Sequence, residues 1–200
     1  MSPVTHFLIG WIVAEGSGAP TRRDRALIAA ASVIPDLDGV GAIVELATRN
    51  TDHPILWFSE YHHALAHNIG FCLVVCAFGV ALATRRVVTP AVMLFVFHLH
   101  LLCDVVGARG PDGEQWPIPY LLPFSLAWEW TWSGQWALNA WPNFVITGLA
   151  LAVMFYLAWR RGRSPVEIFS AKADEVFVRT LRNRFHGSPK NPFPNGHGME

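Results

Sequence analysis

The sequence predicts an all-α protein, a polytopic membrane helical bundle with about four to five membrane segments and a C-terminal amphipathic helix. The chain is 52% hydrophobic and only 15% charged, whereas soluble proteins carry about 25% charged residues. Its longest apolar runs approach the roughly 20 residues that cross a bilayer core. The formal net charge is +0, which gives no electrostatic basis for binding nucleic acid. We therefore expect membrane lipid, and not nucleic acid, as a partner.

Five apolar segments follow one another along the chain, and the first two are the weakest. The first, about residues 4–20, contains Glu15 and several glycines, and the second, about residues 26–46, is broken at Pro35. The three stronger segments cover about residues 69–84, 87–106 and 142–159. Whether the first two segments cross the membrane completely stays open at this point.

The basic residues predict how these segments are oriented. If every segment crosses, all of the 15 lysines and arginines except Arg49 and Arg109 fall on one side of the membrane. Basic residues are enriched on the cytoplasmic side of membrane proteins. We therefore predict a multi-pass protein whose C-terminus is cytoplasmic.

Composition divides the chain into a membrane-embedded domain (1–163), a juxtamembrane amphipathic helix (164–187) and a disordered tail (188–200). Ser164, Pro165 and Glu167 have the spacing typical of a helix start. The helix that follows carries basic residues opposite a broken apolar face, which favours a position on the anionic cytoplasmic leaflet. The tail is rich in Pro, Gly and Asn, which is typical of disorder.

Ionisable side chains inside apolar segments are costly and usually functional, so they identify a candidate site. His100 and Asp104 are four residues apart and share one helix face. His62 and His67 are five apart, about 140° around a continuous helix, so they converge only if the chain is irregular there, or else they have different roles. In the predicted topology all such residues lie towards the non-cytoplasmic end. The candidate ligands are His6, Asp36, Asp38, His62, His63, His67, His100 and Asp104.

Imidazoles and carboxylates without thiolates are the ligand set of catalytic zinc and of other first-row divalent ions. The three cysteines, Cys72, Cys76 and Cys103, lie in apolar runs, and we expect them to be small buried residues. More than four candidate ligands leave room for one or two ions. A bound ion lowers the pKa of its water and polarises a phosphoryl or carbonyl oxygen, so hydrolysis is the expected reaction class.

A proline- and tryptophan-rich segment, about residues 107–141, separates the last two apolar segments. Its prolines exclude a regular helix between Trp116 and Pro123. Clustered tryptophans are typical of a membrane interface. Two interpretations stay open: a lid or rim over the site, and plain interfacial anchoring.

Over roughly Thr5 to Ser125, the chain resembles the bacterial family of LexA-regulated, membrane-bound metal-dependent hydrolases. That family is itself similar in ligand pattern to zinc-dependent phospholipase C. It carries an His-Arg-Gly-x-Thr-His motif, whose histidines match His62 and His67, and an His-Leu-Leu-x-Asp motif, which matches His100 to Asp104. The downstream Trp-Pro-Ile-Pro-Tyr-Leu-Leu-Pro-Phe at residues 116–124 belongs to the same resemblance.

The first motif departs from the family pattern. His63, Ala64 and Ala66 stand where the family usually has Arg, Gly and Thr. The motif's cationic Arg is therefore missing, and either Arg109 replaces it or the substrate differs.

The resemblance implies a metal-dependent hydrolase of the bacterial inner membrane that holds one or two divalent ions, zinc first. Asp36 or Asp38, one or both of His62 and His67, His100 and Asp104 would hold the principal ion, and His6 with a bridging Asp104 would hold a second. Asp38 and Asp104 are the expected catalytic carboxylates, Asp38 being a ligand or the general base.

We expect Arg109 and Trp116 to bind the substrate, a phosphoester that is small or lipid-linked. Two rival functions stay open: a haem-binding membrane redox protein with axial histidines, and a divalent-ion transporter.

Overall fold

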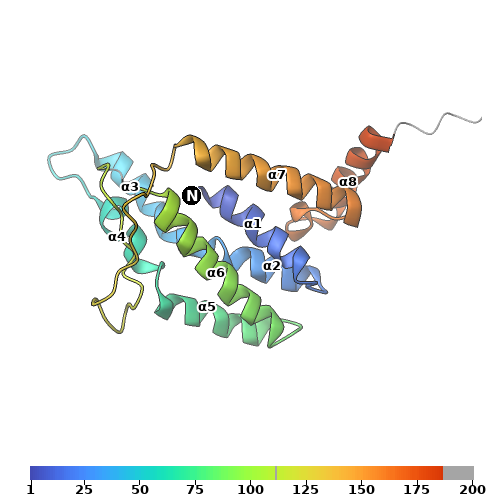
Figure 1. Cartoon of the computed structure of the whole chain (residues 1–200), viewed down its shortest axis with the longest axis horizontal. Helices are drawn as coiled ribbons and strands as arrows, with labels where there is room; N and C mark the ends of the chain where they lie inside the picture. The colour runs from blue at the N-terminus through green and yellow to red at the C-terminus, as the bar shows by residue number, and fades with distance from the viewer. Residues whose placement is uncertain (111, 187–200) are drawn as a thin grey trace, which may run out of the picture. The chain divides into compact units, whose positions relative to one another are not determined.

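The computed structural model describes residues 1–110 and 112–186 and confirms the all-helical prediction within them (Figure 1). The predicted disordered tail, residues 188–200, lies outside the described residues. The α-helices are α1 (Pro3–Gly16), α2 (Arg22–Ala31), α3 (Gly41–Thr48), α4 (Trp57–Leu65), α5 (Ile69–Leu82), α6 (Val88–Gly107), α7 (Trp141–Arg161) and α8 (Ala171–His186). The described residues also contain two 3-10 helices, η1 (Ile34–Val40) and η2 (Pro165–Ile168).

Among the described residues, two helices, α6 and α7, are long and apolar enough to cross a membrane. Two bent pairs raise the number of candidate spans to four: α2 with η1–α3, bent by 53°, and α4 with α5, bent by 60°. The first bend lies beside Pro35, where the sequence predicts a break. Helix α1 has 14 residues, about 21 Å of length against a core of about 30 Å, so it is too short to span alone.

The first compact unit, Met1–Ala152, is built on packing among α1, α2, α5 and α6 (Figure 1). Its apolar core includes Ile28, Val96, Phe97 and Leu101. Helices α1 and α2 approach closely at Gly10, where an added Cβ would lie 2.0 Å from Ser32 Oγ. That approach lets Ser32 Oγ donate a hydrogen bond to the His6 carbonyl at 2.9 Å. Gly10 therefore fixes the position of His6 relative to α2.

A buried polar cluster joins the end of α1, the start of α2 and the α5–α6 turn. Glu15, the charge that interrupts the first apolar segment, lies 3.3 Å from Arg25 Nε. Asp24 accepts hydrogen bonds from the Thr84 amide at 2.9 Å and the Thr89 hydroxyl at 3.0 Å. Buried charges need such partners, so we assign these residues a structural role.

The second compact unit starts at Val153, inside α7, and contains η2 and α8. Ser164 caps the predicted helix start, accepting from the Val166 amide at 3.2 Å, but the turn that it begins is the short η2. The α-helix itself begins later, at Ala171. The predicted single helix is therefore two elements, η2 and α8, separated by Phe169 and Ser170.

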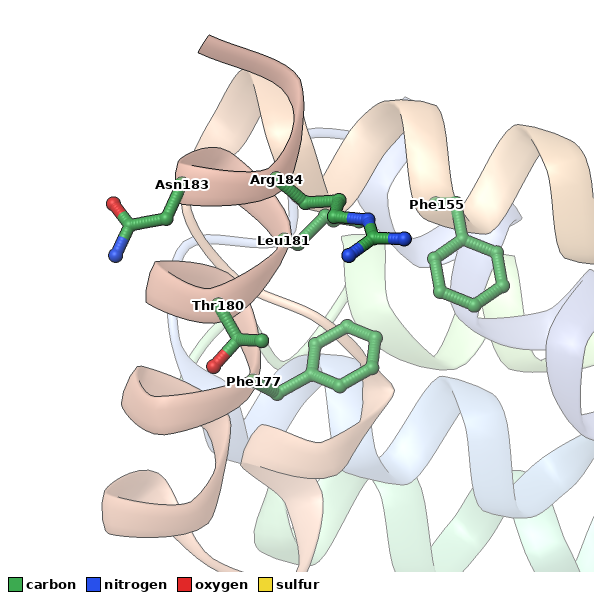
Figure 2. Close-up of a pocket in the computed structure, with 6 residues that line it drawn as sticks. All are labelled: Phe155, Phe177, Thr180, Leu181, Asn183 and Arg184. Atoms are coloured by element: carbon green, nitrogen blue, oxygen red, sulfur yellow. The ribbon is translucent and has the colours of Figure 1, made fainter. Parts of the chain in front are cut away.

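An open groove of about 790 Å³ lies between the end of α7 and α8 within this second unit. Phe155 and Phe177 form its apolar side, with ring centroids 5.8 Å apart. Figure 2 shows Arg184 extending from α8 towards Phe155. The groove therefore combines an apolar wall with a basic rim.

Candidate metal centre

Helix α6 holds His100 and Asp104 one turn apart, and both residues are 1% exposed. His100 Nε2 lies 3.0 Å from Asp104 Oδ2, as the spacing of four predicts. Because a carbonyl oxygen can only accept a hydrogen bond, His100 Nδ1 donates to the Ser32 carbonyl at 2.9 Å. The Nε2 atom of His100 then carries the lone pair and is available to a cation.

His6 and Asp36 join this pair from α1 and η1. His6 Nε2 lies 3.2 Å from Asp104 Oδ1, which the amino group of Met1 also contacts. Asp36 Oδ1 lies 3.7 Å from His100 Nε2. Asp36 Oδ2 is buried and has no hydrogen-bond partner among the described residues. His6, Asp36, His100 and Asp104 each offer a ligand atom within 4.8 Å of the others, and we call them the first donor group.

The break between α4 and α5 brings His62 and His67 together. Helix α4 ends at Leu65, and the Ala66 amide donates to Asp38 Oδ2 at 3.1 Å instead of continuing the helix. His62 Nδ1 lies 2.5 Å from Asp38 Oδ1, and His67 Nδ1 lies 3.4 Å from Asp38 Oδ2. Of the two alternatives left open by the sequence, the irregular chain is therefore the one observed.

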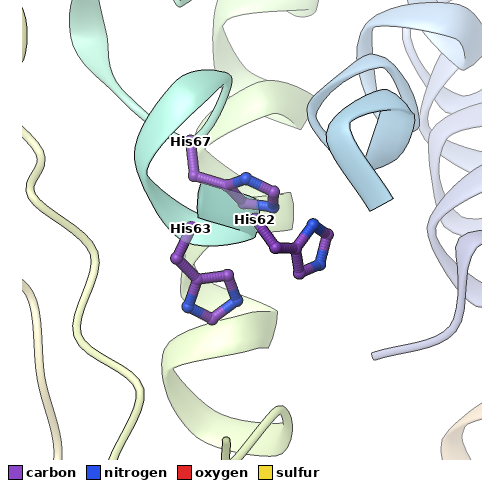
Figure 3. Close-up of side chains that lie close together, drawn as sticks. All are labelled: His62, His63 and His67. Carbon is purple, nitrogen blue, oxygen red and sulfur yellow. The ribbon is translucent and has the colours of Figure 1, made fainter. Parts of the chain in front are cut away.

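His63 lies beside these two residues, as Figure 3 shows. One nitrogen from each of His62, His63 and His67 lies within 4.8 Å of the others, and we call these residues the second donor group. The two groups meet where His67 Nε2 lies 3.1 Å from His100 Nε2. Two ring nitrogens at that separation require a proton or a cation between them.

The structure places Asp36 and Asp38 differently. Asp36 Oδ1 lies 3.8 Å from His62 Nε2 and 4.0 Å from His67 Nε2. It therefore faces the nitrogen of His67 that His100 and Asp104 also approach. Asp38 faces the Nδ1 atoms of the same two histidines. Carboxylates in that position orient metal-binding imidazoles and increase their basicity. The geometry thus favours Asp36 as a ligand and Asp38 as the carboxylate behind the ligands.

A cavity of about 290 Å³ opens onto the centre. Asp36, His62 and Asp104 line it, together with Arg109 and Trp116, the two residues predicted to bind substrate. The proline-rich segment therefore forms one wall of the site. Its Trp128 and Trp132 are exposed, which also fits the predicted anchoring of this segment at the membrane interface.

Gln135 holds this segment against α6 and was not recognised from the sequence. Its side-chain amide donates to the Asp104 carbonyl at 2.9 Å, and its Oε1 accepts from the Trp116 amide at 2.8 Å. Its own carbonyl accepts from Arg109 Nε at 2.7 Å. All three partners are distant from Gln135 in the sequence, so no local sequence pattern predicts its role.

Two other groups of residues lie apart from the centre. His98 Nε2 lies 2.8 Å from the Tyr120 hydroxyl, on another face of α6, as its spacing from His100 predicts. Burial raises the pKa of Tyr120, so its hydroxyl is protonated at neutral pH. Cys72 is buried, as expected, whereas Cys76 and Cys103 are partly exposed, and all three thiols are free.

A protein-family model described as YdjM inner membrane protein matches residues 1–170. The chain belongs to this family. Membership, together with the apolar helices, places the protein in the bacterial inner membrane. No curated protein and no solved structure matches the chain.

In this YdjM-family chain, the two donor groups fit a first-row divalent ion by their chemistry. They contain imidazoles and carboxylates and no thiolate, the set typical of catalytic zinc sites. The buried, unpaired Oδ2 of Asp36 is a group that a cation would stabilise. The grouping differs from that implied by the resemblance, because His62 and His67 lie with His63 and His6 lies with His100.

Proposed function

We propose that this protein is a membrane-bound metal-dependent hydrolase that cleaves a phosphoester. The observation that carries the proposal is the convergence of His67 Nε2, His100 Nε2 and Asp36 Oδ1 directly behind a cavity that Asp36 and Asp104 line. When bound, one or two divalent ions, zinc first, would lower the pKa of a water and polarise a phosphoryl oxygen. His6, Asp36, His100 and Asp104 would hold the first ion.

The three carboxylates of the site have different roles in this proposal. Asp36 would hold the ion through Oδ1, which faces the histidine nitrogens. Its other oxygen, Oδ2, has no hydrogen-bond partner in the described chain and is placed to accept a proton from the attacking water. Asp38, the general base considered from the sequence, faces His62, His67 and the Ala66 amide. Asp38 therefore positions the imidazoles rather than accepting the proton, and Asp104 acts as a ligand.

Two features support a phosphoester that is carried by a lipid. Arg109 lines the cavity and supplies the cation for a phosphate group. The residues flanking the carboxylates are apolar and exposed, with Leu37 at 61% and Ile43 at 71%. Exposed apolar residues close in sequence to the carboxylates of a site suit a substrate that stays partly in the bilayer.

The two rival functions draw less support from the geometry. Axial haem ligation needs a macrocycle between two imidazoles, whereas His67 and His100 approach to 3.1 Å and face carboxylates. An ion pathway needs ligands near the middle of the spans, whereas His6 lies at the start of α1 and Asp104 at the end of α6. Visible haem absorbance, or ion flux in proteoliposomes, would favour the corresponding rival.

The test is metal content measured together with hydrolysis of a chromogenic phosphodiester. The detergent-purified wild type is compared with a His100→Ala, Asp104→Ala double variant and with His98→Ala, a control on the same helix. We expect the wild type and the control to carry zinc and to cleave the ester, and the double variant to lose the ion of the first donor group and the hydrolysis. A wild type that binds no divalent ion, or a loaded protein that cleaves no phosphoester, overturns the proposal.

A further inference from the structure

His63 is a buried histidine to which neither the resemblance nor the proposed first ion assigns a role. Its side chain is 2% exposed. The ring stacks on Trp116, with centroids 4.2 Å apart and an interplanar angle of 26°. Its Nδ1 lies 3.2 Å from the Trp116 carbonyl, and its Nε2 has no hydrogen-bond partner in residues 1–110 and 112–186.

The contact with Trp116 determines which nitrogen of His63 is available. A carbonyl accepts and cannot donate, so Nδ1 carries the proton and Nε2 carries the lone pair. Asp38 likewise accepts a hydrogen bond from Nδ1 of His62. A hydrogen bond from one ring nitrogen to a carbonyl or carboxylate is the usual support of a metal-binding histidine. A buried lone pair without a donor is costly unless a cation meets it.

The rings of the second donor group surround a common space (Figure 3). The ring centroid of His63 lies 5.2 Å from that of His62 and 4.9 Å from that of His67. Zinc binds imidazole nitrogens at about 2.0–2.1 Å, so bound nitrogens lie about 3.4 Å apart in a tetrahedral site. Nitrogens within 4.8 Å of one another reach that separation by side-chain shifts of about 1 Å.

We propose that His62, His63 and His67 form a separate, all-histidine site for a second first-row divalent ion. The inference rests on the proposed function and deepens it, because it fixes the number of ions at two and names the ligands of the second. Asp38 and Asp36 lie against these imidazoles and supply the negative charge that a dication needs. The alternative is that His63 only packs against Trp116.

The experiment measures the number of zinc ions bound by the full-length, detergent-purified protein. Elemental analysis after zinc loading and dialysis gives the stoichiometry, and calorimetric titration with zinc gives the number of binding events. The variant is His63→Asn, because an asparagine amide can still donate to the Trp116 carbonyl but provides no equivalent of Nε2. His98→Asn is the matched control, since His98 is a histidine outside both donor groups.

We expect two equivalents of zinc in the wild type and in His98→Asn, and one equivalent in His63→Asn. A His100→Ala variant should also retain one equivalent, that of the second donor group. One equivalent in the wild type overturns the second site while leaving the proposed function intact, and this result does not depend on whether a variant folds. Loss of both ions from a folded His63→Asn protein overturns the separation of the two sites. No zinc in the wild type removes both proposals.

Discussion

Asp38 provides the sharpest test of the arrangement of the centre. In the structure its oxygens lie 2.5 Å from His62 Nδ1 and 3.4 Å from His67 Nδ1, and one also accepts from the Ala66 amide. Asp38→Asn keeps the size of the side chain but replaces one acceptor oxygen by an amide that only donates. One imidazole then loses its partner, and the negative charge behind both imidazoles disappears.

Removing such a supporting carboxylate lowers metal affinity by about 10- to 100-fold, which corresponds to about 1.4–2.7 kcal/mol. Competition of zinc with a chromophoric chelator measures this change, with helical circular dichroism as the control for folding. Asp36→Asn serves as the comparison, because it removes a direct ligand and should lower affinity further. Equal losses in the two variants would make Asp38 a ligand, and an unchanged affinity in Asp38→Asn would refute its orienting role.

Three further predictions concern residues around the centre and in α8. Gly10→Ala should lower the free energy of unfolding by about 1–3 kcal/mol, because its Cβ would overlap Ser32 Oγ; thermal unfolding measures this, and Gly148→Ala, with open space around it, is the control. Arg109→Ala should raise KM for a phosphoester severalfold while zinc content stays unchanged, and a loss of zinc would contradict its place in the substrate wall. Arg184→Glu should reduce the thermal stabilisation given by anionic lipid, but not by zwitterionic lipid, since Arg184 forms the basic rim of the α8 groove.

The parts of the fold that depend on local periodicity could be predicted from the sequence. The long apolar run of α6 and the spacing of four between His100 and Asp104 determine one helix and one shared face. The end of α1 could not be predicted in the same way, because the helix stops at Gly16 and the chain turns at Gly18, whose φ is 68°, inside the apolar segment expected over about residues 4–20.

The arrangement within the site depends on contacts between distant segments. His62 and His67 converge because Asp38 accepts from the Ala66 amide, a contact over 28 positions. The choice between Asp36 and Asp38 depends on the directions of their side chains in η1, a 3-10 helix that apolar periodicity did not indicate. His63 could be recognised as a candidate ligand, but its stacking on Trp116 could not.

The donors come from α1, η1, the α4–α5 break and α6, and His6 and Asp104 are 98 positions apart. During synthesis, α1 and η1 therefore enter the membrane long before α6 exists. Until then, their imidazole and carboxylates lack the partners that offset the cost of burial at that depth. The site is therefore complete only once α6 has been made. An insertion intermediate that lacks α6 would leave the His6 imidazole and the Asp36 carboxylate without their partners on that helix.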